Sequence, residues 1–424
     1  MATGATFRPI QYLGSKARVL DHIETVVDSL RDSARPVVGD LFAGSGVVAR
    51  RLGNHGPVFA SDIQEYARVL ASALTRPRIS RVEPILDHSS RLLATPVLSR
   101  LFDEEVSRLS ETGWAESLAE DMERGSMALG EAATSTAQAA SLDLTNQSQW
   151  VILRHYGGVY FSYRQAAELD ALAGAIRSIS TLEERDTAMA ALLGAASELA
   201  TSVGNHFAQP VRPRDPQGSL KYGILERVRT LRLRSAIPEF LTKYDQYSRL
   251  EPTRFDVATA TLDFRDALGG LPSDVSVIYA DPPYTRDHYS RFYHVLETIA
   301  LGDNPGVSQV TLGGARVFSR GLYRVNRHQS PFSIVSQAPA AFDQLFRSAR
   351  ERRMSVVLSY SPIPVNEKPR ARVVDLPLLV DIAKRSFADV EALPVEGVRH
   401  SKFNASAQNA PLVDEAEVLL IARA

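Results

Sequence analysis

The stretch Pro36–Asp62, with the sequence PVVGDLFAGSGVVARRLGNHGPVFASD, decides the fold of this chain. It opens with an apolar run (Pro36–Phe42) and passes through a glycine-containing turn into a short helical run (Val47–Leu52). A second apolar run (Pro57–Ser61) follows and ends on the acid Asp62. This order of strand, glycine turn, helix and strand is typical of the opening of an α/β nucleotide-binding fold.

Strand-like runs return in the second half of the chain, at Val275–Pro283, Met354–Pro362 and Glu415–Ala424, with helical stretches between them. Strands that alternate with helices favour a mainly parallel sheet that is covered on both faces. We therefore predict an α/β fold with a Rossmann-like sheet and helices on both of its faces.

A different pattern separates these two groups of strands. Alanine, leucine, glutamate and arginine recur there at helical spacing, as in TAMAALLGAASELATSV (residues 187–203). We predict that residues 86–252 form a large, mostly helical insertion, and that residues 1–85 and 253–424 are the two parts of the α/β domain.

Composition excludes several classes of chemistry. With 44% hydrophobic residues, the 424-residue chain can bury a sizeable core. It has no cysteine, which excludes disulfides, thiolate metal sites and cysteine nucleophiles. The covalent methylation of the cytosine ring carbon, which needs a thiolate, is excluded with them. The histidines are isolated, so we expect no metal site.

Charge and hydropathy limit the partners. A formal net charge of -1 means that a nucleic-acid surface must come from local clusters of Lys and Arg. No apolar run approaches the roughly 20 residues that a membrane-spanning helix needs, and the first residues lack the apolar centre of a signal peptide. We therefore expect a cytoplasmic location and no membrane partner.

The glycine turn is the first candidate binding site. Small residues at Gly44 and Gly46 let the backbone approach a ligand, so the turn can cradle the methionine part of S-adenosylmethionine. Asp62, at the end of the next strand, is placed to accept hydrogen bonds from two ribose hydroxyls. Alternatively, the glycines only shape a tight turn and Asp62 caps the following helix. The turn lacks the full G-x-G-x-x-G pattern, which disfavours a nicotinamide cofactor.

The tetrapeptide Asp281-Pro282-Pro283-Tyr284 directly follows a strand, at the end where open α/β sheets bind ligands. The exocyclic amine of adenine is a poor nucleophile because its lone pair is delocalised into the ring. The Asp281 carboxylate and the Pro282 carbonyl can each accept one amine hydrogen, which aims the lone pair at the methyl group of a sulfonium cofactor.

The other two residues of the tetrapeptide suit the same chemistry. Pro282 and Pro283 fix two φ angles and supply no competing N–H, so the Pro282 carbonyl is held rigidly. Tyr284 can stack on a base that has been flipped out of the duplex. The alternative is a turn that ends the strand, since Asp-Pro and Pro-Pro are common turn dipeptides.

These motifs together resemble a known family. Tyr12-Leu13-Gly14-Ser15-Lys16, Phe42–Gly46, Asp62 and Asp281–Tyr284, in this order, resemble the DNA adenine methylase (Dam-like) family of S-adenosylmethionine-dependent amino-methyltransferases. The resemblance covers the first part of the α/β domain and most of the second. It implies a Rossmann-like methyltransferase sheet and a site-specific enzyme that methylates the N6 amine of adenine in duplex DNA, by base flipping and direct in-line transfer.

The resemblance also implies roles for single residues. Tyr12 and Lys16 would contact the cofactor or the mouth of the active site, and Asp263-Phe264 would lie beside the adenine ring of the cofactor. Catalysis would be carried by Asp281, Pro282, Pro283 and Tyr284. The residues expected around S-adenosylmethionine are Tyr12, Lys16, Asp40, Phe42, Ala43, Gly44, Ser45, Gly46, Asp62, Ile63, Asp263, Phe264 and Asp281.

The insertion is longer than the compact recognition module of the family, and we predict that it recognises the DNA target. Between Val211 and Arg254 there are ten Lys or Arg residues against five acids. A second cluster, Arg286–His294, interleaves basic and aromatic residues, and a third spans Arg320–His328. Alternatively, these are solvated surfaces. The residues expected to bind DNA are Arg212, Arg214, Lys221, Arg227, Arg234, Arg286, His288, Arg291 and Arg324.

Other functions stay open at this stage. The same chemistry suits the N4 amine of cytosine in DNA or the N6 amine of adenine in RNA. A catalytically silent DNA-binding subunit that keeps its cofactor pocket and a nicotinamide oxidoreductase are further alternatives. The expected partners are double-stranded DNA and, as a candidate, a cognate restriction or defence-system protein. The recognised DNA sequence and the oligomeric state are not predicted.

Overall fold

The computed structural model of the chain describes residues 7–125, 149–204, 206–286, 288–361, 372–395 and 417–424. The chain divides into two compact units. The α/β unit is made of residues 12–77, 251–290 and 328–424, and the helical unit of residues 1–11, 78–250 and 291–327.

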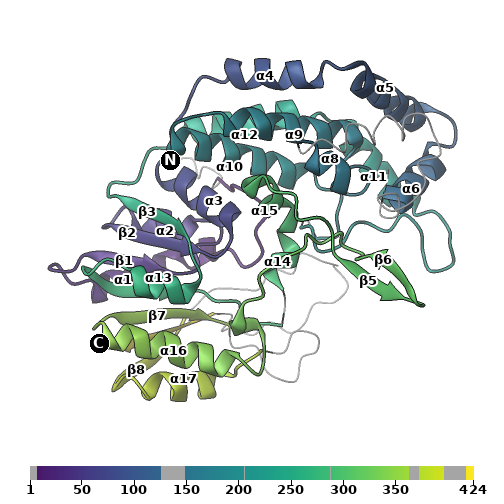
Figure 1. Cartoon of the computed structure of the whole chain (residues 1–424). Coiled ribbons are helices and arrows are strands. Elements are labelled where there is room, and N and C mark those ends of the chain that lie inside the picture. Colours follow the sequence, from purple (N-terminus) through teal and green to yellow (C-terminus); the bar gives the residue numbers. More distant parts are fainter. Residues whose placement is uncertain (1–6, 126–148, 205, 287, 362–371, 396–416) are drawn as a thin grey trace. The chain divides into compact units, whose positions relative to one another are not determined.

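A seven-stranded sheet forms the centre of the α/β unit (Figure 1). From edge to edge its strands are β3 (Val257–Thr261), β2 (Val58–Asp62), β1 (Val37–Asp40), β4 (Val275–Ala280), β7 (Ser355–Tyr360), β9 (Val418–Arg423) and β8 (Asp389–Pro394). The first five are parallel, and β9 runs antiparallel to both of its neighbours. The predicted mainly parallel sheet is confirmed.

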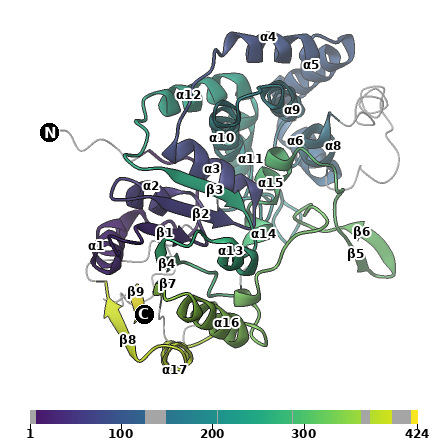
Figure 2. The ribbon, with the colours of Figure 1, turned by 60° about the vertical axis from the view of Figure 1, so that its left-hand side comes forward.

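Helices cover both faces of this sheet (Figure 2). Side chains alternate between the faces along each strand, so Ile278 packs into one hydrophobic cluster while Val277 and Tyr279 pack into the other. One face is covered by α1 (Leu20–Leu30), α2 (Val47–Leu52) and α3 (Glu65–Thr75), and the other by α13 (Phe264–Gly270), α16 (Ala338–Glu351) and α17 (Leu376–Lys384). Helices on both faces were predicted, and this is confirmed.

Two edge strands were not predicted. β3 has the sequence VATAT and β8 has the sequence DVEALP, and both are partly exposed. Edge strands need no continuous apolar run, and short or charged sequences at sheet edges limit aggregation. The pattern of apolar residues therefore identified only the central strands and β9.

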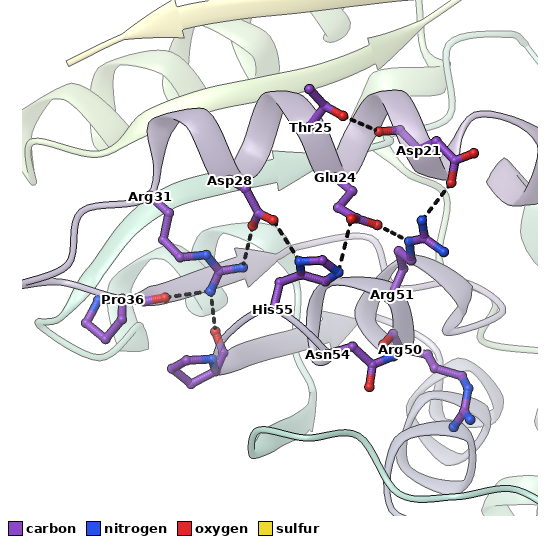
Figure 3. A network of polar contacts seen from close by, with 11 residues as sticks. Asp21, Glu24, Thr25, Asp28, Arg31, Pro36, Arg50, Arg51, Asn54 and His55 are labelled. Carbon is purple, nitrogen blue, oxygen red and sulfur yellow. Dashed lines mark hydrogen bonds and ion pairs between the residues drawn. The ribbon is translucent and has the colours of Figure 1, made fainter.

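A charged network ties α1 to the turn after α2 (Figure 3). His55 lies 3.0 Å from Glu24 Oε1 and 3.0 Å from Asp28 Oδ2. Arg51 contacts Glu24, and Arg31 lies 3.3 Å from Asp28. Glu24, Asp28 and His55 lie close enough together to hold a metal ion. Because arginines already balance both carboxylates, we interpret the cluster as structural, and the absence of a metal site stays a prediction.

The helical unit is built around α10 (Leu182–Leu199), in which nearly every residue from position 186 onward is buried. A helix that is apolar on all sides belongs in a core. It packs against α9 (Tyr163–Arg177), α12 (Ala236–Ser248) and α15 (His294–Leu301). A capping box formed by Ser162 and Gln165 begins α9.

The other elements of the chain are short or peripheral. The helical unit also contains α4 (Glu83–Leu93), α5 (Pro96–Ser110), α6 (Trp114–Gly125), α8 (Val151–Tyr156), α11 (Tyr222–Arg232) and an exposed hairpin of β5 (Gln309–Leu312) and β6 (Ala315–Phe318). The α/β unit contains the 3-10 helices η1 (Lys16–Arg18) and η2 (Pro331–Ser333), and the chain passes between units within α14 (Tyr289–Phe292). In the described ranges, no helix combines the length and apolarity needed to cross a membrane.

Candidate active site

The glycine turn and the tetrapeptide lie next to each other because they follow neighbouring strands. β1 and β4 are paired in parallel, and the Leu41 N–H donates to the Tyr279 carbonyl at 3.2 Å, just beyond β1. Both motifs line one pocket in the α/β unit. Of the residues predicted to bind the cofactor or to catalyse, all except Asp40 and Gly46 line this pocket, and these two adjoin residues that do.

Both glycines of the turn have left-handed backbone conformations, with φ of 53° at Gly44 and 78° at Gly46. A Cβ on Gly44 would lie 2.6 Å from the Tyr12 hydroxyl, and one on Gly46 would lie 2.7 Å from the Ala71 Cα. Glycine is therefore required twice, once by the close approach of Tyr12 and once by the packing of the turn onto α3.

Asp62 ends β2 and holds the turn. Its Oδ2 accepts a hydrogen bond from the Gly44 N–H at 3.0 Å, and its Oδ1 accepts one from the Gln64 N–H at 3.0 Å. Burial raises the pKa of Asp62 to about 6, while these backbone N–H groups act in the opposite direction. Each oxygen keeps a further lone pair, so Asp62 can support the turn and still accept from a ligand in the pocket.

Asp40, the last residue of β1, is fully buried. Its Oδ1 accepts a long hydrogen bond of 3.4 Å from the Phe42 N–H, and its Oδ2 has no partner within the described part of the chain. Burial raises the pKa of Asp40 to about 8. A carboxyl group with this pKa is largely protonated near neutral pH, which lowers the cost of burying it without an ion-pair partner.

Asp281 is held by Lys16. The Lys16 Nζ lies 3.1 Å from Asp281 Oδ1 and 2.9 Å from Glu417 Oε1. Burial raises the pKa of Asp281 to about 6, Lys16 opposes this, and Glu417 adds to it. Burial lowers the pKa of Lys16, but the two carboxylates outweigh this effect, and its pKa lies well above the ordinary value. The lysine is therefore a buried cation.

Tyr284 is also fixed by its neighbours. The Arg372 guanidinium lies 4.7 Å from the centre of its ring, and the Lys16 Nζ lies 5.6 Å from it. The ring of Tyr360 packs at 5.4 Å. Arg372 is held in turn by a hydrogen bond of 2.9 Å to the Ser361 hydroxyl. The tyrosine ring is thus held in place before any ligand binds.

The pocket lining also contains the aromatic rings of Phe42 and Phe264. Phe42 and Phe264 stack with ring centres 6.3 Å apart, and both contact Phe332 edge-on, at 5.4 Å and 4.8 Å. The Asp263 side chain accepts a hydrogen bond from the Arg265 N–H at 3.0 Å and so caps α13. Phe42 and Phe264 therefore form an apolar wall suited to an aromatic ring system.

Some residues in and around the pocket were missed by the sequence analysis. Behind the pocket lining, Glu417, Arg372 and Phe332 contact the predicted residues but belong to no motif of their own. A single acid before a strand, or a single arginine in a loop, is too common to attract attention. Gln64, Tyr66, Leu262 and Gln329 line the pocket and were not predicted, whereas Tyr289 and His328 line it and belong to the clusters that were assigned to DNA.

The structure separates the predicted DNA-binding residues into two kinds. Arg214 contacts Glu116 and Glu123, Arg234 contacts Glu239, and Arg324 is buried and paired with Asp303. Their charges are balanced within the protein. Arg212, Arg227, Arg286 and Arg291 are exposed, Lys221 is half-buried, and His288 lines the pocket.

This chain is similar to a known family and to a known protein. Residues 12–98 and 244–360 match the family described as D12 class N6 adenine-specific DNA methyltransferase. The modification methylase LlaI of Lactococcus lactis subsp. lactis is 37% identical over 113 residues, which are 27% of this chain and 15% of that protein. The match thus spans a small part of that relative. The family match contains the glycine turn and the tetrapeptide and leaves out residues 99–243.

The role of the glycine turn in cofactor binding can be tested by substitution. Gly46→Ala would place a Cβ against the Ala71 backbone in a left-handed conformation, and we expect it to lower the stability by about 1–3 kcal/mol. It should also abolish binding of S-adenosylmethionine, measured by isothermal titration. The control is Gly269→Ala in α13, where the added methyl group meets open space. Equal melting temperatures and equal cofactor binding for both variants would contradict the assigned role of the turn.

Proposed function

Because the chain belongs to the D12 class of N6 adenine-specific DNA methyltransferases, we propose that it transfers a methyl group from S-adenosylmethionine to the N6 amine of adenine in duplex DNA. The observation that carries this proposal is the position of Asp281–Tyr284 beside the glycine turn and Asp62 in one pocket. An acceptor for an amine, a ring for a base and a turn for a nucleoside-type cofactor then lie within reach of one another.

The pocket residues fit S-adenosylmethionine. Gly44 and Gly46 leave the backbone of the turn open to a ligand, and Asp62 has lone pairs free for ribose hydroxyls. Phe42 belongs to the aromatic wall. When bound, the cofactor supplies an electrophilic methyl group on a sulfonium.

Asp281 and Pro282 would activate the amine. Lys16 contacts Asp281 at Oδ1, which leaves Oδ2 to accept one amine hydrogen. The Pro282 carbonyl would accept the other hydrogen. Two acceptors draw the amine lone pair out of conjugation with the ring and fix its direction, so the transfer needs no covalent enzyme intermediate.

Tyr284 would hold the target base after it has been flipped out of the duplex. Arg372 and Tyr360 restrain the tyrosine ring, so little ordering remains to be done on binding. Stacking on an aromatic ring and hydrogen bonds to the base edge are the general means by which a flipped base is held.

We propose that DNA phosphates bind the helical unit at Tyr323. The guanidinium groups of Arg291 and Arg327 lie 5.4 Å and 4.7 Å from the centre of this ring. Burial lowers the pKa of Arg327, and the nearby charge of Arg291 lowers it further. Neither arginine makes an ion pair with an acid among the described residues. Two adjacent cations without an acid would be stabilised by a phosphate between them.

We also propose that the helical unit reads the target sequence. The long insertion lies mostly outside the family match, and a site-specific enzyme needs an element that its relatives with other targets do not share. Arg212, Lys221 and Arg227 of the helical unit and Arg286 of the α/β unit stay candidate contacts, whereas buried Arg324 is left out of the contact set. A cognate restriction or defence-system protein stays a candidate partner, and a cytoplasmic location stays a prediction.

The amine-activating role of Asp281 is tested by Asp281→Asn. We expect methyl transfer to fall by about 10³-fold because the amide can no longer accept as a carboxylate does, while the melting temperature and cofactor binding persist. Mass spectrometry of nucleosides from treated duplex DNA measures this. Asp381→Asn, on the exposed side of α17, should stay fully active. Unchanged methylation by Asp281→Asn would indicate a different chemistry or a contaminating enzyme.

The pH dependence follows from the same carboxyl group. Burial, the largest cause, raises the pKa of Asp281 to about 6, and the activating form is the carboxylate. The turnover rate should therefore be constant at high pH and fall about tenfold per pH unit below pH 6. Rates at saturating cofactor and DNA, measured between about pH 4 and pH 8, check this. A decline that begins only near the ordinary value of about 4 would contradict it.

The phosphate surface is tested by the double variant Arg291→Ala/Arg327→Ala. A plot of the logarithm of the binding constant against the logarithm of the salt concentration has a slope set by the number of phosphate contacts. Each lost contact should make this slope shallower by about 1, so the double variant should make it shallower by about 2. Fluorescence anisotropy with duplex DNA at several salt concentrations gives this slope. Arg234→Ala is the control, because Glu239 already pairs with that arginine. An unchanged slope in the double variant would contradict the proposed surface.

A further inference from the structure

Three charged side chains connect the beginning, the middle and the end of the α/β unit. Lys16 lies in η1, Asp281 follows β4, and Glu417 precedes β9. The Lys16 Nζ lies 3.1 Å from Asp281 Oδ1 and 2.9 Å from Glu417 Oε1. The side chains of Lys16 and Glu417 are only 6% and 8% exposed, against 21% for Asp281. Glu417 is thus remote in sequence from both other groups, but it contacts the lysine that contacts the tetrapeptide.

Neutralising the lysine does not require Glu417. A buried ammonium group needs one carboxylate to balance its charge, and Asp281 already provides it. The second carboxylate leaves the cluster with a net negative charge in a largely buried place, which costs stability. Glu417 therefore contributes something other than the charge balance of Lys16.

The geometry supplies an explanation. A lysine side chain has a flexible four-carbon stem, so an ammonium group that is held by one carboxylate can still move around that carboxylate. A second carboxylate in ion-pair contact, with Glu417 Oε1 2.9 Å from Nζ, restrains the Nζ position further. Glu417 is itself restrained, because its carbonyl accepts a hydrogen bond of 2.9 Å from the Val395 N–H. The ammonium group therefore reaches Asp281 from one fixed direction.

We propose that Glu417 is a positioning residue for methyl transfer, which holds Lys16 on Asp281 Oδ1 and thereby keeps the other carboxylate oxygen available to the amine. This inference rests on the proposed function. Glu417 acts through Lys16 and needs no contact with DNA or the cofactor. A second consequence is electrostatic, because the charge of Glu417 opposes ionisation of Asp281.

The pKa of Asp281 reports this coupling. Burial raises it to about 6, Lys16 lowers it, and Glu417 raises it. The titratable groups that face Asp281 from the surrounding elements are Lys16, Glu417, Asp40, Tyr279 and Tyr284. Removing the charge of Glu417 while keeping its shape should therefore lower the pKa of Asp281. A role in folding alone would leave that pKa unchanged.

The experiment compares two variants of the full chain. Glu417→Gln keeps the shape and an acceptor for Lys16 but removes the charge, so the acidic decline of kcat should move to lower pH while kcat at its plateau stays near the wild-type value. Glu417→Ala removes the anchor as well, and its plateau kcat should fall by about 10- to 100-fold, with KM for S-adenosylmethionine nearly unchanged. Glu198→Gln is the matched control, because Glu198 pairs with Lys243 at 3.1 Å in the helical unit.

A second readout needs no activity. In protein without cofactor, the Asp281 signal in ¹³C NMR of labelled aspartate carboxyl groups is identified by its absence in Asp281→Asn. Its titration midpoint should be lower in Glu417→Gln than in the wild type and unchanged in Glu198→Gln.

The outcomes separate the two proposals. If the wild-type protein methylates no adenine, the proposed function fails and the positioning role fails with it. If the wild type is active and both Glu417 variants keep its kcat, its pH profile and its NMR midpoint, only the positioning role is overturned. A lower melting temperature with unchanged kinetics also overturns it. A shifted pH profile in Glu417→Gln together with a lowered kcat in Glu417→Ala supports it.

Discussion

The parallel pairing of β1 with β4 is the constraint on which the rest of the site depends. Because both strands are central and end at the same edge of the sheet, the glycine turn and the tetrapeptide emerge beside each other although more than half of the chain separates them. The long helical insertion does not disturb this pairing, since it leaves the sheet after α3 and returns at β3. The buried apolar side chains of β4 on both faces hold the pairing together.

Charge balance then decides how each ionisable group can act. Lys16 stays a cation because two carboxylates flank it, and Asp281 ionises near neutral pH because burial and Glu417 oppose Lys16. In the helical unit, Arg324 is neutralised by Asp303, whereas Arg291 and Arg327 share one aromatic ring without an acid. The same residue type thus supports the fold in one place and, in our proposal, binds a phosphate in another.

The sequence predicted the parts of the site that depend on neighbouring residues. A glycine turn between a strand and a helix, an acid at the end of the next strand and an Asp-Pro-Pro-Tyr tetrapeptide after a strand are local patterns, and the pocket brings them together. Glu417 could not be predicted, because its partner Lys16 lies at the other end of the chain. The acid partners of Arg214, which are Glu116 and Glu123, and the edge strands β3 and β8 were likewise determined by tertiary packing and by no local pattern.

The central claim is that this pocket delivers a methyl group to the amine of adenine. The most direct measurement incubates the purified full chain with duplex DNA and S-adenosylmethionine that carries a deuterated methyl group, and identifies the labelled nucleoside by mass spectrometry. The account predicts labelled N6-methyldeoxyadenosine. Label on cytosine, or none in the DNA while a control methyltransferase labels the same substrate, would contradict it.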